Sequence, residues 1–251
     1  MRDVGSFEER NARFRASWGP ERRLAHLVRT ERPTVLDVGA HIGQSNRLFR
    51  RLFPDATIRS FEPDPDSFAA LVAAVDASLP GGCERLAFSD RDGRATLHRN
   101  PIAHTNSLYR RNAESRDSID VERARRAGLA PELGIGSVDV EVRRLDSYCA
   151  TTGIDHVDLL KIDVQGAEVD VLRGATGVLD AVDNVVVEIS FFDLYERSSS
   201  FLEVESLLAP HGLRLYALIE VSDNPMNGRT DWVTAAYTRL DVLPVEDVVS
   251  P

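Results

Sequence analysis

Two apolar strands in close succession, the first entering a glycine turn and the second ending in an acid, most constrain what this chain can fold into. Residues 35–38 form the first run, residues 39–43 read Gly-Ala-His-Ile-Gly, and the second run ends at Glu62. A βαβ unit of this kind holds a nucleotide-like cofactor at the carboxyl ends of its strands. The pattern therefore predicts an α/β fold and an enzyme that takes its chemistry from a bound small molecule.

The spacing of the glycines narrows the class of cofactor. Gly39 and Gly43 are not followed by the third glycine that lets a helix approach a pyrophosphate closely, so a dinucleotide fits poorly. An adenosine without phosphates fits better, because the two oxygens of the Glu62 carboxylate can accept both ribose hydroxyls. The alternative for Glu62 is a helix-capping acid. For Asp37 the alternative is a turn or cap residue, against a role in orienting the glycine turn or the amino-acid part of the cofactor.

Length and composition limit the classes of protein that this chain can belong to. The 251 residues suffice for one large core, which favours a single α/β domain with additions. The net charge of −10 argues against a nucleic-acid partner, because phosphates require a basic surface. No apolar run approaches the roughly 20 residues that span a bilayer, and the first residues lack the apolar core of a signal peptide. We therefore expect a cytoplasmic protein.

Hydrophobic patterning predicts one open sheet with helices on both faces. Residues 1–33 form an N-terminal helical extension in this interpretation, either packed on the sheet, closed as a lid or reaching a partner subunit. Residues 34–240 form the main domain and residues 241–251 a tail. Strands are expected at residues 34–38, 58–61, 85–88, 158–164, 184–189, 213–219 and 232–238, with the last two paired as an antiparallel hairpin. Helices are expected at residues 44–53, from 65 until Gly81-Gly82, at 145–152, at 165–172 and after Ser200.

The middle of the chain departs from this alternation. Residues 89–93 predict a turn that joins the strand at 85–88 to a hairpin partner at 94–99. Residues 100–137 are mostly polar, with one helix expected near 121–127, and we interpret this stretch as an insertion on the substrate side. Residues 138–145 alternate in the way that an edge strand does.

Polar residues follow almost every predicted strand. They are Asp37, Glu62, Ser89 with Asp90, Asp163 and Glu188. Ligands of open α/β sheets lie beyond the carboxyl ends of the strands, so all are candidates for the site. For Ser89 and Asp90, turn chemistry alone competes with contact to an adenine.

Lys161 is the only lysine among 30 basic residues. It shares one face of its strand with Asp163, where a desolvated ammonium requires a carboxylate neighbour. A buried ion pair that only fixes the geometry of the sheet is the competing interpretation. Glu188 is expected beside Asp163, and two acids there could orient an acceptor hydroxyl, take its proton or hold a divalent cation.

The sequence resembles the FkbM-type methyltransferases, which use S-adenosylmethionine. The resemblance extends in order from about residue 34 to residue 237, and it is carried by residues 37–40, 42–43, 61–63, 160–168, 171–175 and 187–188. It implies a class I methyltransferase fold: an α/β, Rossmann-like sheet of seven mostly parallel strands, the last of them antiparallel, with helices on both faces. It also implies that Asp37, Gly39, Gly43 and Glu62 line the cofactor. Two departures are His41, where the family commonly has Asn, and the long segment at residues 100–137.

The resemblance implies an S-adenosylmethionine-dependent O-methyltransferase that acts on a hydroxyl of a sugar, a polysaccharide or a glycosylated or polyketide natural product. We expect the remaining cofactor contacts from Ala40, His41, Pro63, Ser89, Asp90 and Asp163. The candidates for catalysis are Asp163, Glu188 and His104, although a histidine in a polar loop can also be a plain solvent-exposed residue. Asp163 and Glu188 are also the candidates for a divalent cation such as Mg²⁺.

Partners and alternatives complete these expectations. The expected partner is a small-molecule or oligosaccharide acceptor, and the apolar flanks of the domain allow a homodimer. A nucleotide-dependent oxidoreductase with the same βαβ start is one alternative, and the absence of the third glycine argues against it. A non-catalytic binding module is the other alternative, and the acids at the strand ends argue against it.

Overall fold

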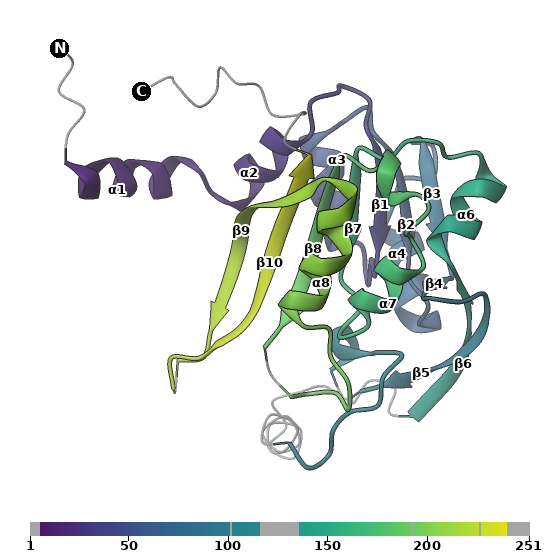
Figure 1. The fold of residues 1–251 in the computed structure, drawn as a ribbon. Coiled ribbons are helices and arrows are strands. Elements are labelled where there is room, and N and C mark those ends of the chain that lie inside the picture. Colours follow the sequence, from purple (N-terminus) through teal and green to yellow (C-terminus); the bar gives the residue numbers. More distant parts are fainter. Residues whose placement is uncertain (1–5, 101, 116–135, 192, 226, 240–251) are drawn as a thin grey trace.

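The computed structural model describes residues 6–100, 102–115, 136–191, 193–225 and 227–239. Its main sheet has seven strands in the order β3-β2-β1-β7-β8-β10-β9 (Figure 1). All neighbouring pairs are parallel except those of β10, which is antiparallel to β8 and β9. The strands are β1 (Thr34–Val38), β2 (Thr57–Phe61), β3 (Gly81–Glu84), β7 (Leu159–Ile162), β8 (Asn184–Ser190), β9 (Leu213–Asp223) and β10 (Thr230–Arg239). The predicted mostly parallel sheet with an antiparallel last strand is confirmed.

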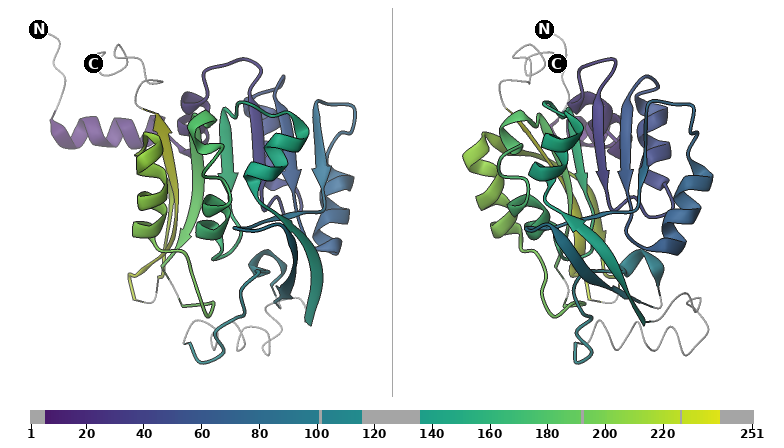
Figure 2. Two further views of the ribbon diagram at one scale, coloured as in Figure 1. Left: turned by 45° about the vertical axis from the view of Figure 1, so that its right-hand side comes forward. Right: turned by 90° about the vertical axis from the view of Figure 1, so that its right-hand side faces the viewer.

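Helices cover both faces of the sheet, as the right-hand view of Figure 2 shows. The bounds are α1 (Phe7–Ser17), α2 (Pro20–Leu27), α3 (Gln44–Leu52), α4 (Pro65–Ala74), α6 (Leu145–Thr152), α7 (Glu168–Arg173) and α8 (Phe201–Leu208). Side chains of α6, α7 and α8 join one buried cluster with β1, β7 and β8. Side chains of α2 and α3 join a second cluster on the opposite face. Parallel strands buried on both faces need the near-continuous apolar sequence that β8 has.

Local sequence explains where two of the helices begin. The Asp64 carboxylate accepts hydrogen bonds from the backbone N–H groups of Asp66 and Ser67 and so caps α4. Ser200 and Glu203 form a reciprocal capping box at the start of α8. Both helix starts were expected from the sequence.

A second, three-stranded sheet corrects the interpretation of the middle of the chain. It consists of β4 (Ala87–Phe88), β6 (Gly136–Arg143) and β5 (Gly93–Arg99), in the order β4-β6-β5. The predicted hairpin between residues 85–88 and 94–99 is wrong, because β5 pairs with β6 instead. The expectation of an edge strand at 138–145 is also wrong, since β6 is the central strand of this small sheet.

Two glycine signals were also misread. Gly81 and Gly82 do not end α4 but begin β3, the third strand of the main sheet, and Gly81 approaches the backbone of Ile58. The helix expected from residue 165 begins only at Glu168, because Gln165 and Gly166 both adopt positive φ angles. The helix expected near residues 121–127 lies outside the described residues.

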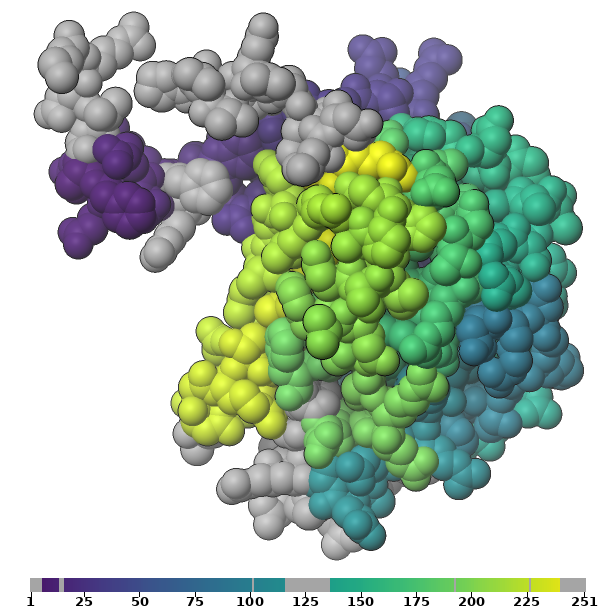
Figure 3. All heavy atoms as spheres, in the orientation of Figure 1, coloured from purple at the N-terminus to yellow at the C-terminus, as the bar shows by residue number. Residues whose placement is uncertain are grey.

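The N-terminal helices differ in how they meet the domain. α2 buries Leu24 and Leu27, whereas α1 projects from the rest of the described chain, with Phe7 70% exposed (Figure 3). In the part of the chain that the structure describes, no helix has both the length and the apolar character needed to cross a membrane.

Candidate active site

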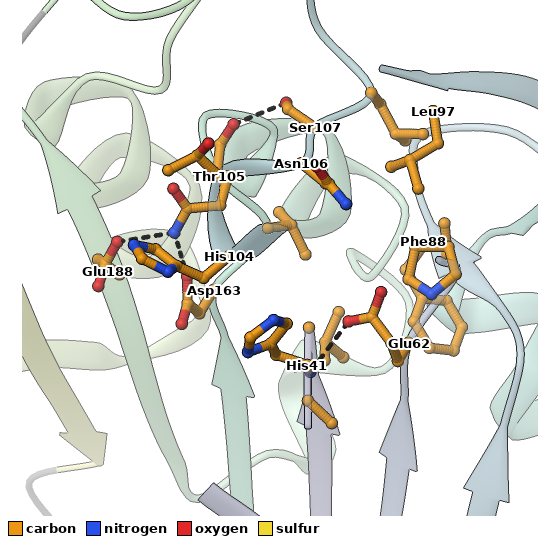
Figure 4. A pocket seen from close by; sticks show the side chains of 18 of the residues that line it. His41, Glu62, Phe88, Leu97, His104, Thr105, Asn106, Ser107, Asp163 and Glu188 are labelled. Atoms are coloured by element: carbon orange, nitrogen blue, oxygen red, sulfur yellow. Dashed lines mark hydrogen bonds between the residues drawn. The ribbon is translucent and has the colours of Figure 1, made fainter. Parts of the chain in front are cut away.

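A cavity of about 440 Å³ lies at the carboxyl ends of β1, β2, β7 and β8. Figure 4 shows Glu62, Phe88 and Leu97 at one end, Asp163, Glu188 and His104 at the other, and His41 between them. Nine residues that the sequence singled out line this cavity: Gly39, Ala40, His41, Glu62, Pro63, His104, Lys161, Asp163 and Glu188. The strand ends therefore converge as expected for an open α/β sheet.

Four other candidates do not line the cavity. Asp37 is fully buried beneath it and accepts hydrogen bonds from the hydroxyls of Ser45 and Ser60. Gly43 occupies the N-cap position of α3. The backbone N–H of Ser89 donates to the carbonyl of Arg143, and Arg144 donates to the carbonyl of Asp90, so both residues hold the small sheet against α6. Direct contact between these four residues and the cofactor stays a prediction.

The glycine turn is pressed between the two neighbouring strands. The backbone N–H groups of Gly39 and Ala40 both donate to the carbonyl of Phe61. A Cβ atom on Gly39, whose φ is +79°, would lie 1.8 Å from the carbonyl oxygen of Asp163. Only glycine fits at this position. His41, which follows in the turn, also has a positive φ of 47°.

Glu62 carries a nearly buried carboxylate at the apolar end of the cavity. Its exposed fraction is 7%. Its two oxygens accept hydrogen bonds from the backbone N–H groups of His41, at 2.9 Å, and Asp64, at 2.8 Å. Burial raises the pKa of Glu62 to about 7, although the two backbone hydrogen bonds oppose the shift. Because each oxygen accepts one N–H group, each keeps acceptor capacity for a ligand.

Lys161 connects the glycine turn to two carboxylates, those of Asp37 and Asp163. Its ammonium donates to the carbonyl of Gly39 at 2.7 Å and lies 3.3 Å from Asp37 Oδ1 and 3.6 Å from Asp163 Oδ2. Burial alone would lower the pKa of Lys161, but the two carboxylates outweigh it and the pKa is raised. The predicted pairing of Lys161 with Asp163 is present, and its contacts with Gly39 and Asp37 were not foreseen.

Gln165 bridges the two acids at the other end of the cavity. Its amide Nε2 donates to Asp163 Oδ1 at 2.8 Å and to Glu188 Oε1 at 3.0 Å. Burial, followed by the charge of Asp163, raises the pKa of Glu188 to about 8. Sequence reasoning placed Gln165 in a helix and so missed it; its backbone φ of 58° turns it out of the helix and into the site.

The loop that carries His104 is fastened to the same acid end. The hydroxyl of Ser107 donates to the carbonyl of Gln165 at 2.7 Å, and the hydroxyl of Tyr195 donates to the carbonyl of Thr105 at 2.8 Å. The rings of His104 and His41 meet edge to face, with centroids 6.2 Å apart. Burial, and then the charge of His104, lower the pKa of His41. His104 is therefore held at the cavity although it comes from a polar loop.

One group of three acidic or histidine side chains, among the residues that the structure describes, has the spacing of a metal site. It consists of His156, Asp158 and Asp183, which precede β7 and β8 at their amino ends, away from the cavity. Asp163 and Glu188 do not belong to such a group. Instead, they share an amide donor from Gln165.

The chain is similar to known methyltransferases over most of its length. Residues 37–215 match the Methyltransferase FkbM domain. The chain is 32% identical to 2-O-methyltransferase NoeI of Sinorhizobium fredii, over 74% of this chain and 75% of that protein. It is also 32% identical to 31-O-demethyl-FK506 methyltransferase FkbM of Streptomyces tacrolimicus, over 73% of each chain. A third relative, hexuronic acid methyltransferase AglP of Haloferax volcanii, is 28% identical over 65% of this chain and 59% of its own length.

A solved structure agrees on the fold. The methyltransferase FkbM of Methylobacillus flagellatus superposes with a TM-score of 0.51 at 14% identity, over 84% of this chain and 45% of that chain. The expected class I methyltransferase fold is thereby confirmed. From the match to residues 37–215 and the relatives at 32% identity, this chain belongs to the FkbM family of S-adenosylmethionine-dependent O-methyltransferases.

Proposed function

We propose that this O-methyltransferase acts on a hydroxyl of a sugar, a polysaccharide or a glycosylated or polyketide natural product. The names of three relatives support this acceptor class: a 2-O-methyltransferase, a methyltransferase of a demethylated FK506 and a hexuronic acid methyltransferase. The single observation that carries the proposal is the division of one cavity between a buried carboxylate at an apolar end and two acids at the other. This division suits a nucleoside on one side and a hydroxyl on the other.

We assign the adenosine half of the cofactor to the end that contains Glu62. The carboxylate would accept the two ribose hydroxyls with its remaining lone pairs, while Phe88 and Leu97 offer apolar contact to a base. Gly39, without a side chain, leaves room along the turn for the rest of the molecule. Ala40, His41, Pro63 and Asp163 complete the proposed contacts, whereas Asp37 and Gly43 support the turn from outside the cavity.

Methyl transfer then requires that the acceptor oxygen is positioned and that its proton is removed. When bound, S-adenosylmethionine supplies a methyl group that its sulfonium has already activated. Glu188 in its ionised form would accept the proton of the acceptor hydroxyl, because its raised pKa makes it a stronger base than an ordinary carboxylate. Gln165 holds Glu188 and Asp163 in a fixed orientation, and His104 is the second candidate for the base.

A divalent cation between Asp163 and Glu188 is the alternative way to activate the hydroxyl. Such a cation would have to displace the Gln165 amide, whose Nε2 already donates to both carboxylates. We therefore favour direct proton removal. Methyl transfer that persists in excess EDTA is the expected result, and transfer that EDTA abolishes and Mg²⁺ restores would establish the cation instead.

The test of the proposal is transfer of labelled methyl from S-adenosylmethionine to a panel of saccharide, glycoside and polyketide acceptors. We expect label on an oxygen of at least one acceptor, and a rate reduced at least about 100-fold in Glu188→Gln. Glu31→Gln, which removes an exposed carboxylate just before the amino end of β1, is the control and should behave as the unaltered protein. Labelling confined to nitrogen, or full activity in Glu188→Gln, would contradict the proposal.

A further inference from the structure

A second cavity, of about 240 Å³, lies beside the first on the face of the sheet that α2 and α3 cover. Ser45, Lys161, Asp163 and Glu188 line both cavities. Glu188, the proposed base, therefore forms part of a wall common to the two spaces. Of the proposed cofactor contacts, only Asp163 also lines the second cavity, and the rest of that cavity has no assigned role.

Most of the walls of this second cavity away from the shared residues are apolar. Leu24 comes from α2, Leu48 and Phe49 from α3, Val186 from β8 and Ile219 from β9. The same five side chains belong to, or pack against, the core cluster on this face. An apolar cavity of about 150 Å³ holds a benzene ring, so a space of this size can take an alkyl chain or a ring edge.

Two side-chain contacts hold α2 over the cavity. The guanidinium of Arg23 donates to the carbonyl of Leu218 in β9 at 2.6 Å, and Arg51 of α3 pairs with Glu21 at 2.5 Å. Helix α2, which covers the cavity, is therefore held to both β9 and α3. Glu21 and Glu220, which are exposed and line the same cavity, make its rim acidic and so disfavour an anionic ligand.

We propose that the second cavity binds the apolar part of an amphiphilic acceptor, so that the hydroxyl to be methylated is presented at the wall formed by Lys161, Asp163 and Glu188. This inference rests on the proposed function and narrows it. The acceptor is an uncharged alkyl or macrocyclic glycoside or polyketide, not a free sugar. Burial of the apolar arm fixes the position of the hydroxyl, and the binding energy of that arm is used to orient the reacting oxygen.

The experiment is a calorimetric titration with methyl, butyl, hexyl and octyl β-D-glucopyranoside, each below its critical micelle concentration, in the presence of saturating S-adenosylhomocysteine. We expect affinity to rise with chain length, by up to about fourfold for each methylene that the cavity buries. The same series used as methyl acceptors should show kcat/KM rising with chain length. Equal affinities of methyl and octyl glucoside would overturn the proposal.

Two variants of α2 locate the binding. Leu24→Trp fills the cavity and should remove the advantage of octyl over methyl glucoside, whereas Ala25→Trp, on the exposed side of the same helix, should retain it. Leu48→Glu offers a second way to block the cavity if the tryptophan at position 24 prevents folding. An octyl advantage that survives both Leu24→Trp and Leu48→Glu places the chain elsewhere and refutes the inference.

Binding of S-adenosylhomocysteine separates this inference from the proposed function. If the unaltered protein binds S-adenosylhomocysteine but shows no dependence on chain length, the second cavity is not an acceptor site, although the assignment of the first cavity stands. If S-adenosylhomocysteine itself does not bind, the proposed function fails, and the inference fails with it.

Discussion

The ammonium of Lys161 meets acceptors from three segments of the chain. They are the carbonyl of Gly39 in the turn, the carboxylate of Asp37 at the end of β1 and the carboxylate of Asp163 beyond β7. A compact ammonium can point at all three from one buried position, whereas a planar guanidinium on a longer stem cannot. This geometry explains why one lysine stands among so many arginines.

Substitution of Lys161 tests this role. We expect Lys161→Met to lower the free energy of unfolding by about 3–5 kcal/mol, because it leaves the buried Asp37 carboxylate without a cationic partner. Lys161→Arg should also be destabilised, and both variants should bind S-adenosylhomocysteine at least about tenfold more weakly. Arg91→Met, at an exposed arginine in the turn before β5, is the matched control. Urea unfolding and calorimetry provide the measurements, and a Lys161→Arg protein that equals the unaltered one would refute the account.

At the scale of the elements, the turn between β1 and α3 depends on close contact with the end of β7. A Cβ on Gly39 would lie 1.8 Å from the carbonyl oxygen of Asp163, which is itself backbone and cannot move independently. The turn and the strand end therefore form one unit. Any residue other than glycine must push them apart and open the cavity between them.

Gly39→Ala is the corresponding prediction. We expect a loss of several kcal/mol in the free energy of unfolding, from the overlap and from the positive φ of 79°, together with loss of S-adenosylhomocysteine binding. Gly19→Ala is the control, because nothing lies within 4 Å of the added Cβ and its φ is −68°. Thermal unfolding with and without the ligand would show the difference. A stable Gly39→Ala protein with normal binding would contradict the assigned packing.

Most of the main elements could be predicted because their signals are local. The cap at Asp64, the capping box at Ser200 and the continuous apolar run of β8 each lie within a few residues. The three-stranded sheet could not be predicted, since β5 pairs with β6 across more than thirty residues of sequence. The sequence of neither strand indicates which strand it will pair with. The same reason explains the failure at Gly81, whose close approach to Ile58 is a tertiary contact.

The residues of the site also differ in whether a local sequence signal marks them. Glu62, Asp163 and Glu188 were found because an acid at a strand end is visible in the sequence. Phe88 and Leu97 were missed as cavity residues, because apolar side chains that line a cavity look like those of a core. Gln165 was missed because its role depends on a backbone conformation that its neighbours impose.

At the scale of the whole molecule, three largely buried carboxyl groups make stability depend on pH: Glu62 and Glu188 at the cavity and Glu168 at the start of α7. Burial raises the pKa values of Glu62 and Glu168 to about 7 and, with the charge of Asp163, that of Glu188 to about 8. Between pH 4.5 and 8 the folded chain therefore holds more protons on these groups than the unfolded chain does. Their contribution to stability is present at low pH and is lost as the pH rises through these values.

We predict that the ligand-free protein is less stable at pH 8 than at pH 6, by on the order of 5 kcal/mol from these three groups. Glu188→Gln removes one of them and should flatten the dependence, while Glu31→Gln should leave it unchanged. Urea unfolding across this pH range is the measurement. Stability that rises from pH 6 to pH 8 would show that these carboxylates are ionised without cost in the fold.

The central claim is that an adenosine cofactor binds in the first cavity through the carboxylate of Glu62. Isothermal titration calorimetry with S-adenosylhomocysteine tests it most directly, on the unaltered protein, on Glu62→Ala and on the control Glu31→Ala. The account predicts one site per chain, unchanged affinity in Glu31→Ala and a loss of at least about 30-fold in Glu62→Ala, since two hydrogen bonds to a charged group are removed. Absence of binding to the unaltered protein, or equal affinity in Glu62→Ala, would contradict it.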